Sequence, residues 1–180
     1  MEHQIAATKT WLSEVIIGLN FCPFAKKEFV NESIHYYLSK ETSFDKALET
    51  LVHQCEFLAN NSSIETGLVI FDSGFGEFEQ YLDLLDFANQ LIVDSGYEGI
   101  FQIASFHPNY CFEGEESDDA ANFTNRSPYP MLHILREDSL EKVLASYKNP
   151  ELIPEQNITV AREKGAEFFQ QKLKKIHMDY

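Results

Sequence analysis

Residues 66–71, with the sequence TGLVIF, and residues 100–106, with the sequence IFQIASF, decide the fold that we expect for this chain. The first run is too continuously apolar for a strand with one face in water, and such runs are typical of buried strands in partly parallel sheets. Between the two runs, residues 77–94 repeat apolar residues at helical spacing and stop before Gly96. A strand, a helix and a strand in this order predict a crossover that makes the two strands buried neighbours.

The segments before and after this unit continue the alternation of helices and strands. Apolar residues recur at helical spacing in residues 8–19 and 43–59. Two further helices are predicted over residues 139–147, opened by Ser139, and residues 155–175, opened by Pro154. Two short segments are predicted strands, residues 33–38 and 131–136. This order predicts an α/β fold, with α+β as the alternative, in which a mixed, mainly parallel sheet of about four strands packs against helices. We expect residues 1–180 to form one globular domain, with the C-terminal helix 155–175 peripheral to it.

The charge and hydropathy of the chain argue against several classes of function. The formal net charge is -15, and so acidic a surface repels phosphate groups, so neither nucleic acid nor a membrane is an expected partner. No apolar run reaches about 18 residues, the length of a membrane-spanning helix, and the first residues lack the features of a secretory signal, so we expect a cytoplasmic protein. Cys22, Cys55 and Cys111 are an odd number at wide spacings, which indicates neither a disulfide framework nor a zinc ribbon.

Residues 107–130 form a long segment without apolar periodicity between two predicted strands. Loops of this length inside a domain are usually functional or disordered, and here Pro108, Pro128 and Pro130, together with aromatic residues, disfavour disorder. In sheets of this class, ligands bind beyond the strand ends, at places where strand order or direction changes. The sequence therefore predicts a polar crevice at this loop that binds a small anionic molecule.

Three side chains of the loop are predicted to carry acid–base chemistry. His107 is the first candidate, because an imidazole both donates and accepts protons near neutral pH. Asp118 and Asp119 would orient this histidine or bind a polar group of the substrate. A structural histidine at the end of a strand, hydrogen-bonded to the loop, is the alternative for His107.

Five further residues are predicted to bind the ligand. Arg126, whose guanidinium group suits a carboxylate or a phosphate, follows Asn125 and precedes a segment stiffened by proline. An internal ion pair is the alternative for Arg126. Tyr110 belongs to the same loop, and Asp72 follows an earlier strand at the same edge of the predicted sheet. His133 alternates with apolar neighbours on one face of the last strand, where a core histidine is the alternative.

No cofactor and no metal site are predicted. His107, His133 and Asp118 have the chemistry that zinc or iron requires, which keeps a metal-dependent hydrolase or oxygenase as an alternative, but their spacing is not that of a dedicated site. Cys22 follows the end of a predicted helix, where a thiol is not activated, so we expect it to pack in the core.

The segments GLNFCPFA (18–25), FHPNY (106–110) and DDAANFTNRSPYPMLHILRE (118–137) carry a resemblance to a known family. Together with PEQN (154–157), they resemble an uncharacterised bacterial family known only as a domain of unknown function, and the resemblance covers nearly the whole chain. The resemblance brings no activity with it. It implies that seven candidates lie in the family's motif segments, which are Cys22, His107, Asp118, Asp119, Asn125, Arg126 and His133.

The loop chemistry favours an enzyme that binds a small anionic molecule, although the sequence predicts no reaction class and no oligomeric state. A non-catalytic protein-interaction module is the remaining alternative. Such a module would use the aromatic residues of the loop as a binding surface and would need no converging polar side chains.

Overall fold

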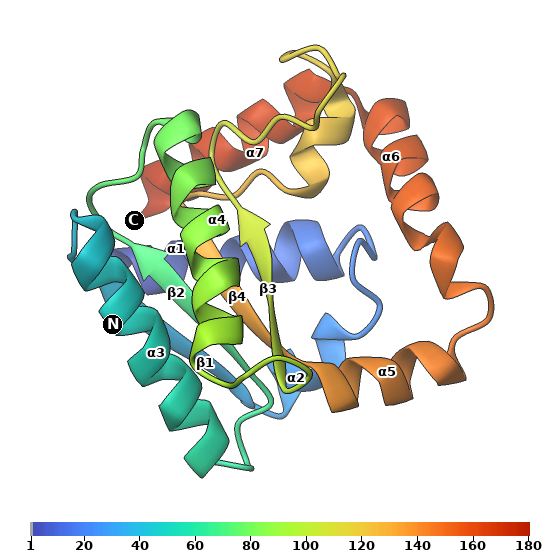
Figure 1. Ribbon diagram of the computed structural model, residues 1–180. Coiled ribbons are helices and arrows are strands. Elements are labelled where there is room, and N and C mark those ends of the chain that lie inside the picture. The colour runs from blue at the N-terminus through green and yellow to red at the C-terminus, as the bar shows by residue number, and fades with distance from the viewer. Residues whose placement is uncertain (1) are drawn as a thin grey trace.

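Four strands form one sheet in the computed structural model, which describes residues 2–180 (Figure 1). The strands β1 (Ile34–Ser39), β2 (Thr66–Phe71), β4 (Met131–Arg136) and β3 (Phe101–Phe106) lie side by side in this order. β1 is parallel to β2, whereas β4 is antiparallel to both of its neighbours, β2 and β3. The structure confirms a mixed sheet packed with helices, but the expectation of a mainly parallel sheet is wrong.

The position of β4 also changes which strands are neighbours. The prediction that residues 66–71 and 100–106 are adjacent is wrong, because β4 separates them and β3 lies at the edge of the sheet. Every residue of β2 is buried, as its continuous apolar run predicts. Such a run indicates that both faces of a strand are covered, but it is the same for a parallel and an antiparallel neighbour.

One face of the sheet is covered by two long helices, α3 (Phe44–Asn60) and α4 (Phe78–Asp94), which lie next to each other in Figure 1. Their apolar stripes pack against the strand residues that point to this face, among them Val69, Leu132 and Ile134. Both helices begin and end within one residue of the ranges that the apolar spacing predicts. The amphipathic pattern therefore places these two elements correctly.

The opposite face is covered by N-terminal and C-terminal helices. α1 (His3–Trp11) continues into a π-helix, η1 (Leu12–Ile17), so the predicted helix 8–19 starts earlier than expected. The short helix α2 (Ala25–Val30) follows, and the sequence prediction misses it because none of its residues is buried. α7 (Ala166–Asp179) contacts α1 on this side of the sheet. No helix within residues 2–180 is both long enough and apolar enough to cross a membrane.

The chain between β4 and α7 forms a strap, which we define as residues 137–164. It consists of α5 (Glu137–Ser146), the 3-10 turn η3 (Pro150–Leu152) and α6 (Ile153–Lys164). The predicted single helix over 155–175 is wrong, since Gly165 ends α6 with φ 79° and ψ 152°. A positive φ of this kind costs glycine little, and it lets the chain turn before α7 begins.

Candidate functional site

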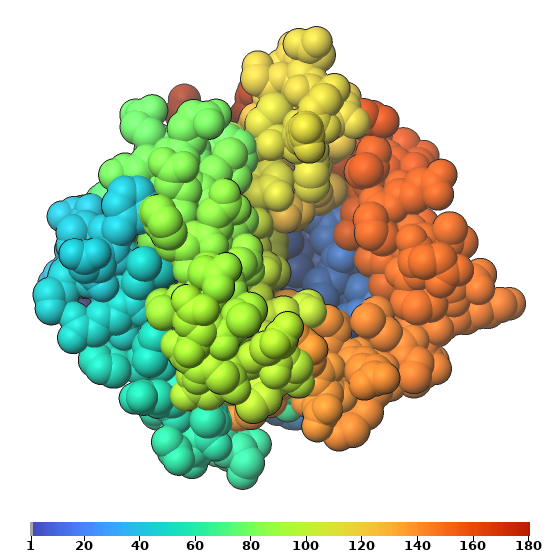
Figure 2. Space-filling model, in the orientation of Figure 1, coloured from blue at the N-terminus to red at the C-terminus, as the bar shows by residue number. Residues whose placement is uncertain are grey.

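A cavity of about 260 Å³ lies on the sheet face that α1 and η1 cover. In the space-filling view, a hollow opens between β3 and the strap, and blue N-terminal residues are visible inside it (Figure 2). The strands contribute eight of the residues that line the cavity, which are Ile34, Thr66, Leu68, Ala104, Phe106, His133, Leu135 and Arg136. The opposite walls come from η1, from the turn before α2 and from α5, which adds Leu140 and Val143. The cavity is thus a largely apolar space at the edge strand of the sheet.

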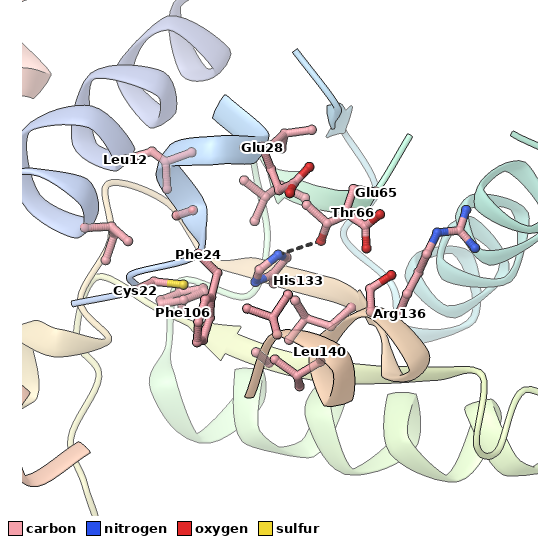
Figure 3. Close-up of a pocket in the computed structure, with 18 of the residues that line it drawn as sticks. Leu12, Cys22, Phe24, Glu28, Glu65, Thr66, Phe106, His133, Arg136 and Leu140 are labelled. Carbon is pink, nitrogen blue, oxygen red and sulfur yellow. Dashed lines mark hydrogen bonds between the residues drawn. The ribbon is translucent and has the colours of Figure 1, made fainter. Parts of the chain in front are cut away.

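His133 and Thr66 form the main polar feature of the cavity wall. Thr66 is the first residue of β2, and its side chain shares a sheet face with His133 because β2 and β4 are paired. The Thr66 hydroxyl donates to the carbonyl oxygen of Ile134 at 2.6 Å, and Thr66 Oγ1 lies 2.7 Å from Nε2 of His133 (Figure 3). A hydroxyl has a single proton to donate. Since that proton goes to Ile134, Nε2 of His133 must carry the proton of the second hydrogen bond.

The tautomer of His133 determines what the histidine offers to a ligand. With the proton on Nε2, the neutral ring has an unprotonated Nδ1 that can only accept a hydrogen bond. No residue among 2–180 donates to this atom. Burial lowers the pKa of His133 from 6.5 to about 4, because the apolar surroundings disfavour the imidazolium ion. At neutral pH, His133 therefore offers a neutral hydrogen-bond acceptor in a largely apolar wall.

Two other side chains of the cavity behave differently. Cys22 is half-buried, and burial raises the pKa of its thiol, so the side chain is not activated as a nucleophile. Arg136 contributes to the wall, but its guanidinium group points away from His133 in Figure 3. That group donates to the carbonyl oxygens of Leu58, Asn61 and Ile64 at the C-terminal end of α3. Arg136 therefore completes a helix end and does not supply a cation to the cavity.

His107 is buried at the end of β3, and both of its ring nitrogens have partners. The backbone N–H of Asn109 donates to Nδ1 at 3.0 Å, so Nε2 carries the proton and donates to the carbonyl oxygen of Phe75, also at 3.0 Å. The ring packs against Phe78 and Tyr81. Burial lowers the pKa of His107, which keeps the ring neutral. These contacts support the structural alternative, in which the histidine joins the loop to the strand end.

Arg126 and its neighbours are also engaged within the loop. The guanidinium group of Arg126 donates to the carbonyl oxygens of Tyr110 at 2.9 Å and Ser117 at 2.7 Å, and it lies 4.6 Å from the ring centre of Phe123. The side-chain amide of Asn125 donates to the carbonyl oxygen of Ser105 at 3.1 Å. These groups hold the chain of the loop together, and none of them lines the cavity.

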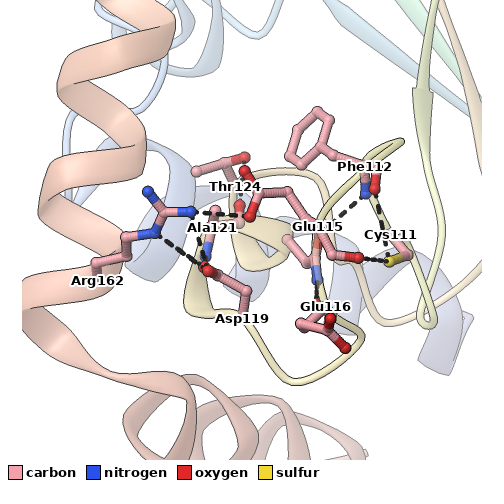
Figure 4. Close-up of polar contacts among 9 residues, drawn as sticks. Cys111, Phe112, Glu115, Glu116, Asp119, Ala121, Thr124 and Arg162 are labelled. Atoms are coloured by element: carbon pink, nitrogen blue, oxygen red, sulfur yellow. Dashed lines mark hydrogen bonds and ion pairs between the residues drawn. The ribbon is translucent and has the colours of Figure 1, made fainter.

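The three aspartates of the predicted site have different surroundings. Asp119 caps the 3-10 helix η2 (Ala120–Thr124) and forms an ion pair with Arg162 of the strap, which Glu115 joins (Figure 4). Asp118 is exposed. Asp72 is exposed as well and accepts a hydrogen bond from the side-chain amide of Gln4. Asp119 therefore connects the loop to the strap.

The structure brings few of the predicted site residues together. His107 and Tyr110 both pack on Phe78, and Tyr110 accepts from Arg126 through its backbone, whereas His133 lies in the cavity wall. Within residues 2–180, no three His, Cys, Asp or Glu side chains converge as metal ligands would. The roles predicted for the loop residues stay predictions, and among the candidates only Cys22 and His133 line the cavity.

Several residues of the cavity were missed by reasoning from sequence. Phe24, Leu140 and Val143 have no signature that separates them from core residues, since the cavity that they line lies between elements distant in the chain. Thr66 could have been found only through the pairing of β2 with β4, which places it on the same face as His133.

Comparison with known proteins yields one match. A family model whose description is "Protein of unknown function (DUF1415)" matches residues 3–171. No curated protein and no solved structure matches the chain.

Proposed function

The chain belongs to the family of proteins of unknown function DUF1415, and we propose that it binds a small, largely apolar molecule in the cavity. In this proposal, a hydroxyl or N–H group of the ligand donates a hydrogen bond to Nδ1 of His133. The single observation that carries the proposal is the direction of the Thr66 hydrogen bond, which leaves Nδ1 as an acceptor that faces an apolar space.

Apolar walls with a few placed polar groups are what small-molecule sites share. A ligand gains affinity by covering surfaces such as Phe106, Leu140 and Val143, and one hydrogen bond then orients it. At about 260 Å³, the cavity is close to the lower end of ligand pockets, roughly 300–1,000 Å³. These dimensions favour a ligand with one ring or a short chain.

This location differs from the crevice that the sequence predicts. In the loop 107–130, the guanidinium group of Arg126 donates to carbonyl oxygens of the loop itself. The guanidinium group of Arg136, a residue of the cavity wall, points away from the cavity. The geometry therefore favours a ligand that is not an anion. His133 is the side chain placed to accept a hydrogen bond from such a ligand.

A comparison of phenol with toluene tests the proposal, because the two molecules differ mainly in the donor group. We expect isothermal titration to show that phenol binds the wild-type protein about tenfold more tightly than toluene, as one hydrogen bond of about 1.4 kcal/mol would produce. His133→Phe keeps a ring of similar size but removes the acceptor, so the two ligands should then bind equally. His35→Phe is the matched control, since His35 packs on Phe57 at the other face of the sheet. Absence of binding by either ligand to the wild type would refute the proposal.

A further inference from the structure

The helix α5 lines the cavity without being packed into the core of the protein. Leu140 and Val143 belong to the cavity wall, and with Leu144 they form an apolar stripe at helical spacing. A helix with such a stripe normally buries it against a neighbouring element. None of the residues of α5 is buried, so the stripe is only partly covered.

Few polar contacts hold α5 in place. Its first backbone N–H, that of Glu137, donates to the carbonyl oxygen of Ile100 at 3.0 Å. Within residues 2–180, no side chain of α5 forms a hydrogen bond or an ion pair with another element. Directly after the helix, the ring of Tyr147 contacts that of Phe24, with 5.7 Å between the ring centres. Apolar contacts therefore decide where most of α5 lies.

The chain is anchored both before and after α5. Before the helix, the guanidinium group of Arg136 donates to carbonyl oxygens at the end of α3. After it, the side-chain amide of Asn157 donates to the carbonyl oxygen of Phe21 at 2.7 Å, and Arg162 forms its ion pair with Asp119. Figure 1 shows α5 running outward from the end of β4 and α6 returning toward the loop. A loosely held helix thus lies between two anchored parts of the strap.

The two ends of α5 have the positions of hinges. Asn149 lies between α5 and η3, is exposed, and has φ 57° and ψ 57°, a left-handed conformation that asparagine adopts more readily than most residues. At the other end, Glu137 follows β4 directly. Hinges are commonly a few residues at the ends of elements that absorb a change in backbone angles. A rotation at these two places would move α5 while the anchored segments stay in position.

We propose that α5 is a lid that closes over the cavity when a ligand is bound. This inference rests on the proposed function and concerns how the same cavity takes up and holds its ligand. A bound ligand gives Leu140 and Val143 an apolar surface to cover, and contacts made only in the closed position shift the lid toward it. Figure 2 shows the hollow between β3 and the strap, which this closure narrows.

Amide hydrogen exchange of the full chain, followed by NMR, tests the lid. Without ligand, we expect amides of α5 to exchange at least about tenfold faster than those of α6, because α5 has no buried residue and α6 is anchored. The probe is 4-ethylphenol, which adds a short apolar chain to phenol. At about ten times its dissociation constant, it should slow exchange in α5 about tenfold, as expected if opening of the lid releases the ligand. The exposed turn at Gly114 does not line the cavity, so its exchange should not change.

Tyr147→Ala loosens the lid without changing the cavity wall. The substitution removes the contact with Phe24, and Tyr147 itself does not line the cavity. We expect exchange in α5 to become about fivefold faster, as the loss of one aromatic pair would produce. Tyr37→Ala is the matched control, because Tyr37 is an exposed tyrosine of β1 that does not line the cavity either. It should leave exchange in α5 unchanged.

The outcomes separate the lid from the proposed function. If isothermal titration shows that 4-ethylphenol binds but exchange in α5 does not slow, the lid is wrong while the cavity remains a ligand site. The lid is also wrong if α5 exchanges as slowly as α6 without ligand, or if Tyr147→Ala has no more effect than Tyr37→Ala. If 4-ethylphenol does not bind, both the proposed function and the lid fail.

Discussion

Thr66 determines which nitrogen of His133 carries the proton. Its hydroxyl donates to the carbonyl oxygen of Ile134, and its oxygen accepts from Nε2 of His133 at 2.7 Å. Nδ1 is therefore left as an acceptor toward the cavity. A threonine on one strand thus sets the hydrogen-bonding character of a histidine on the next strand.

Thr66→Val tests this relationship. The substitution keeps the shape of the side chain but removes the acceptor for Nε2, so either tautomer of His133 becomes accessible. We expect the free energy of unfolding in urea to fall by about 2 kcal/mol, because two buried hydrogen bonds are lost. The preference for phenol over toluene should fall from about tenfold to less than about threefold. Thr50→Val, at another buried threonine, is the control, and an unchanged preference in Thr66→Val would show that Thr66 does not set the tautomer.

Stability should depend on pH through His133. The pKa of this histidine is lowered to about 4 in the folded protein, so the unfolded chain binds a proton more readily as the pH falls below 6.5. The contribution of the neutral ring to stability is complete above pH 6.5 and is lost as the pH falls toward 4, by about 3 kcal/mol in all. Urea unfolding of wild type and His133→Phe across this range measures the difference. Parallel curves for the two proteins would show that the histidine titrates normally when folded.

His107→Ala should destabilise the protein without closing the cavity. The substitution leaves the carbonyl oxygen of Phe75 and the N–H of Asn109 without their partner and opens space beside Phe78 and Tyr81. We expect the free energy of unfolding to fall by about 3 kcal/mol, while folded protein still binds phenol. A variant that keeps its stability but loses binding would return the functional site to the loop.

A larger side chain in the cavity should block the binding of a ligand there. Leu140 lines the cavity from α5, and none of the residues of that helix is buried, so Leu140→Trp places a larger ring in open space. We expect the affinity for phenol to fall more than about tenfold, with less than about 1 kcal/mol lost in unfolding free energy. Ala145→Trp on the same helix is the control, since Ala145 is exposed and does not line the cavity. Equal binding by both variants and the wild type would place the ligand elsewhere.

The sequence predicts the elements of this fold better than their arrangement. Helical spacing locates α3 and α4, and the apolar run of residues 66–71 locates a strand that is buried on both faces. The direction of β4 was not predictable in this way, because side-chain burial does not record whether a neighbouring strand is parallel. The break at Gly165 was missed because the apolar pattern continues on both sides of it.

The location of the candidate site was likewise predictable only in part. Polar residues such as Arg126 and Asn125 favour a ligand site in the loop, but their side chains donate to backbone carbonyl oxygens and hold the loop in shape. A sequence does not show whether a polar group will be satisfied internally. The cavity depends on residues such as Leu140 that resemble ordinary core residues, and its location follows only from how β3, η1 and α5 are placed.

The protonation of His133 in solution tests the central claim most directly. A ¹⁵N–¹H correlation spectrum of the histidine rings at pH 7, assigned by comparison with His133→Phe, distinguishes a protonated from an unprotonated ring nitrogen. We predict a neutral ring with the proton on Nε2 and an unprotonated Nδ1, whose resonance shifts when 4-ethylphenol is added. A proton on Nδ1, either in the other tautomer or in the imidazolium ion, would contradict the proposal that this histidine accepts a hydrogen bond from a ligand in the cavity.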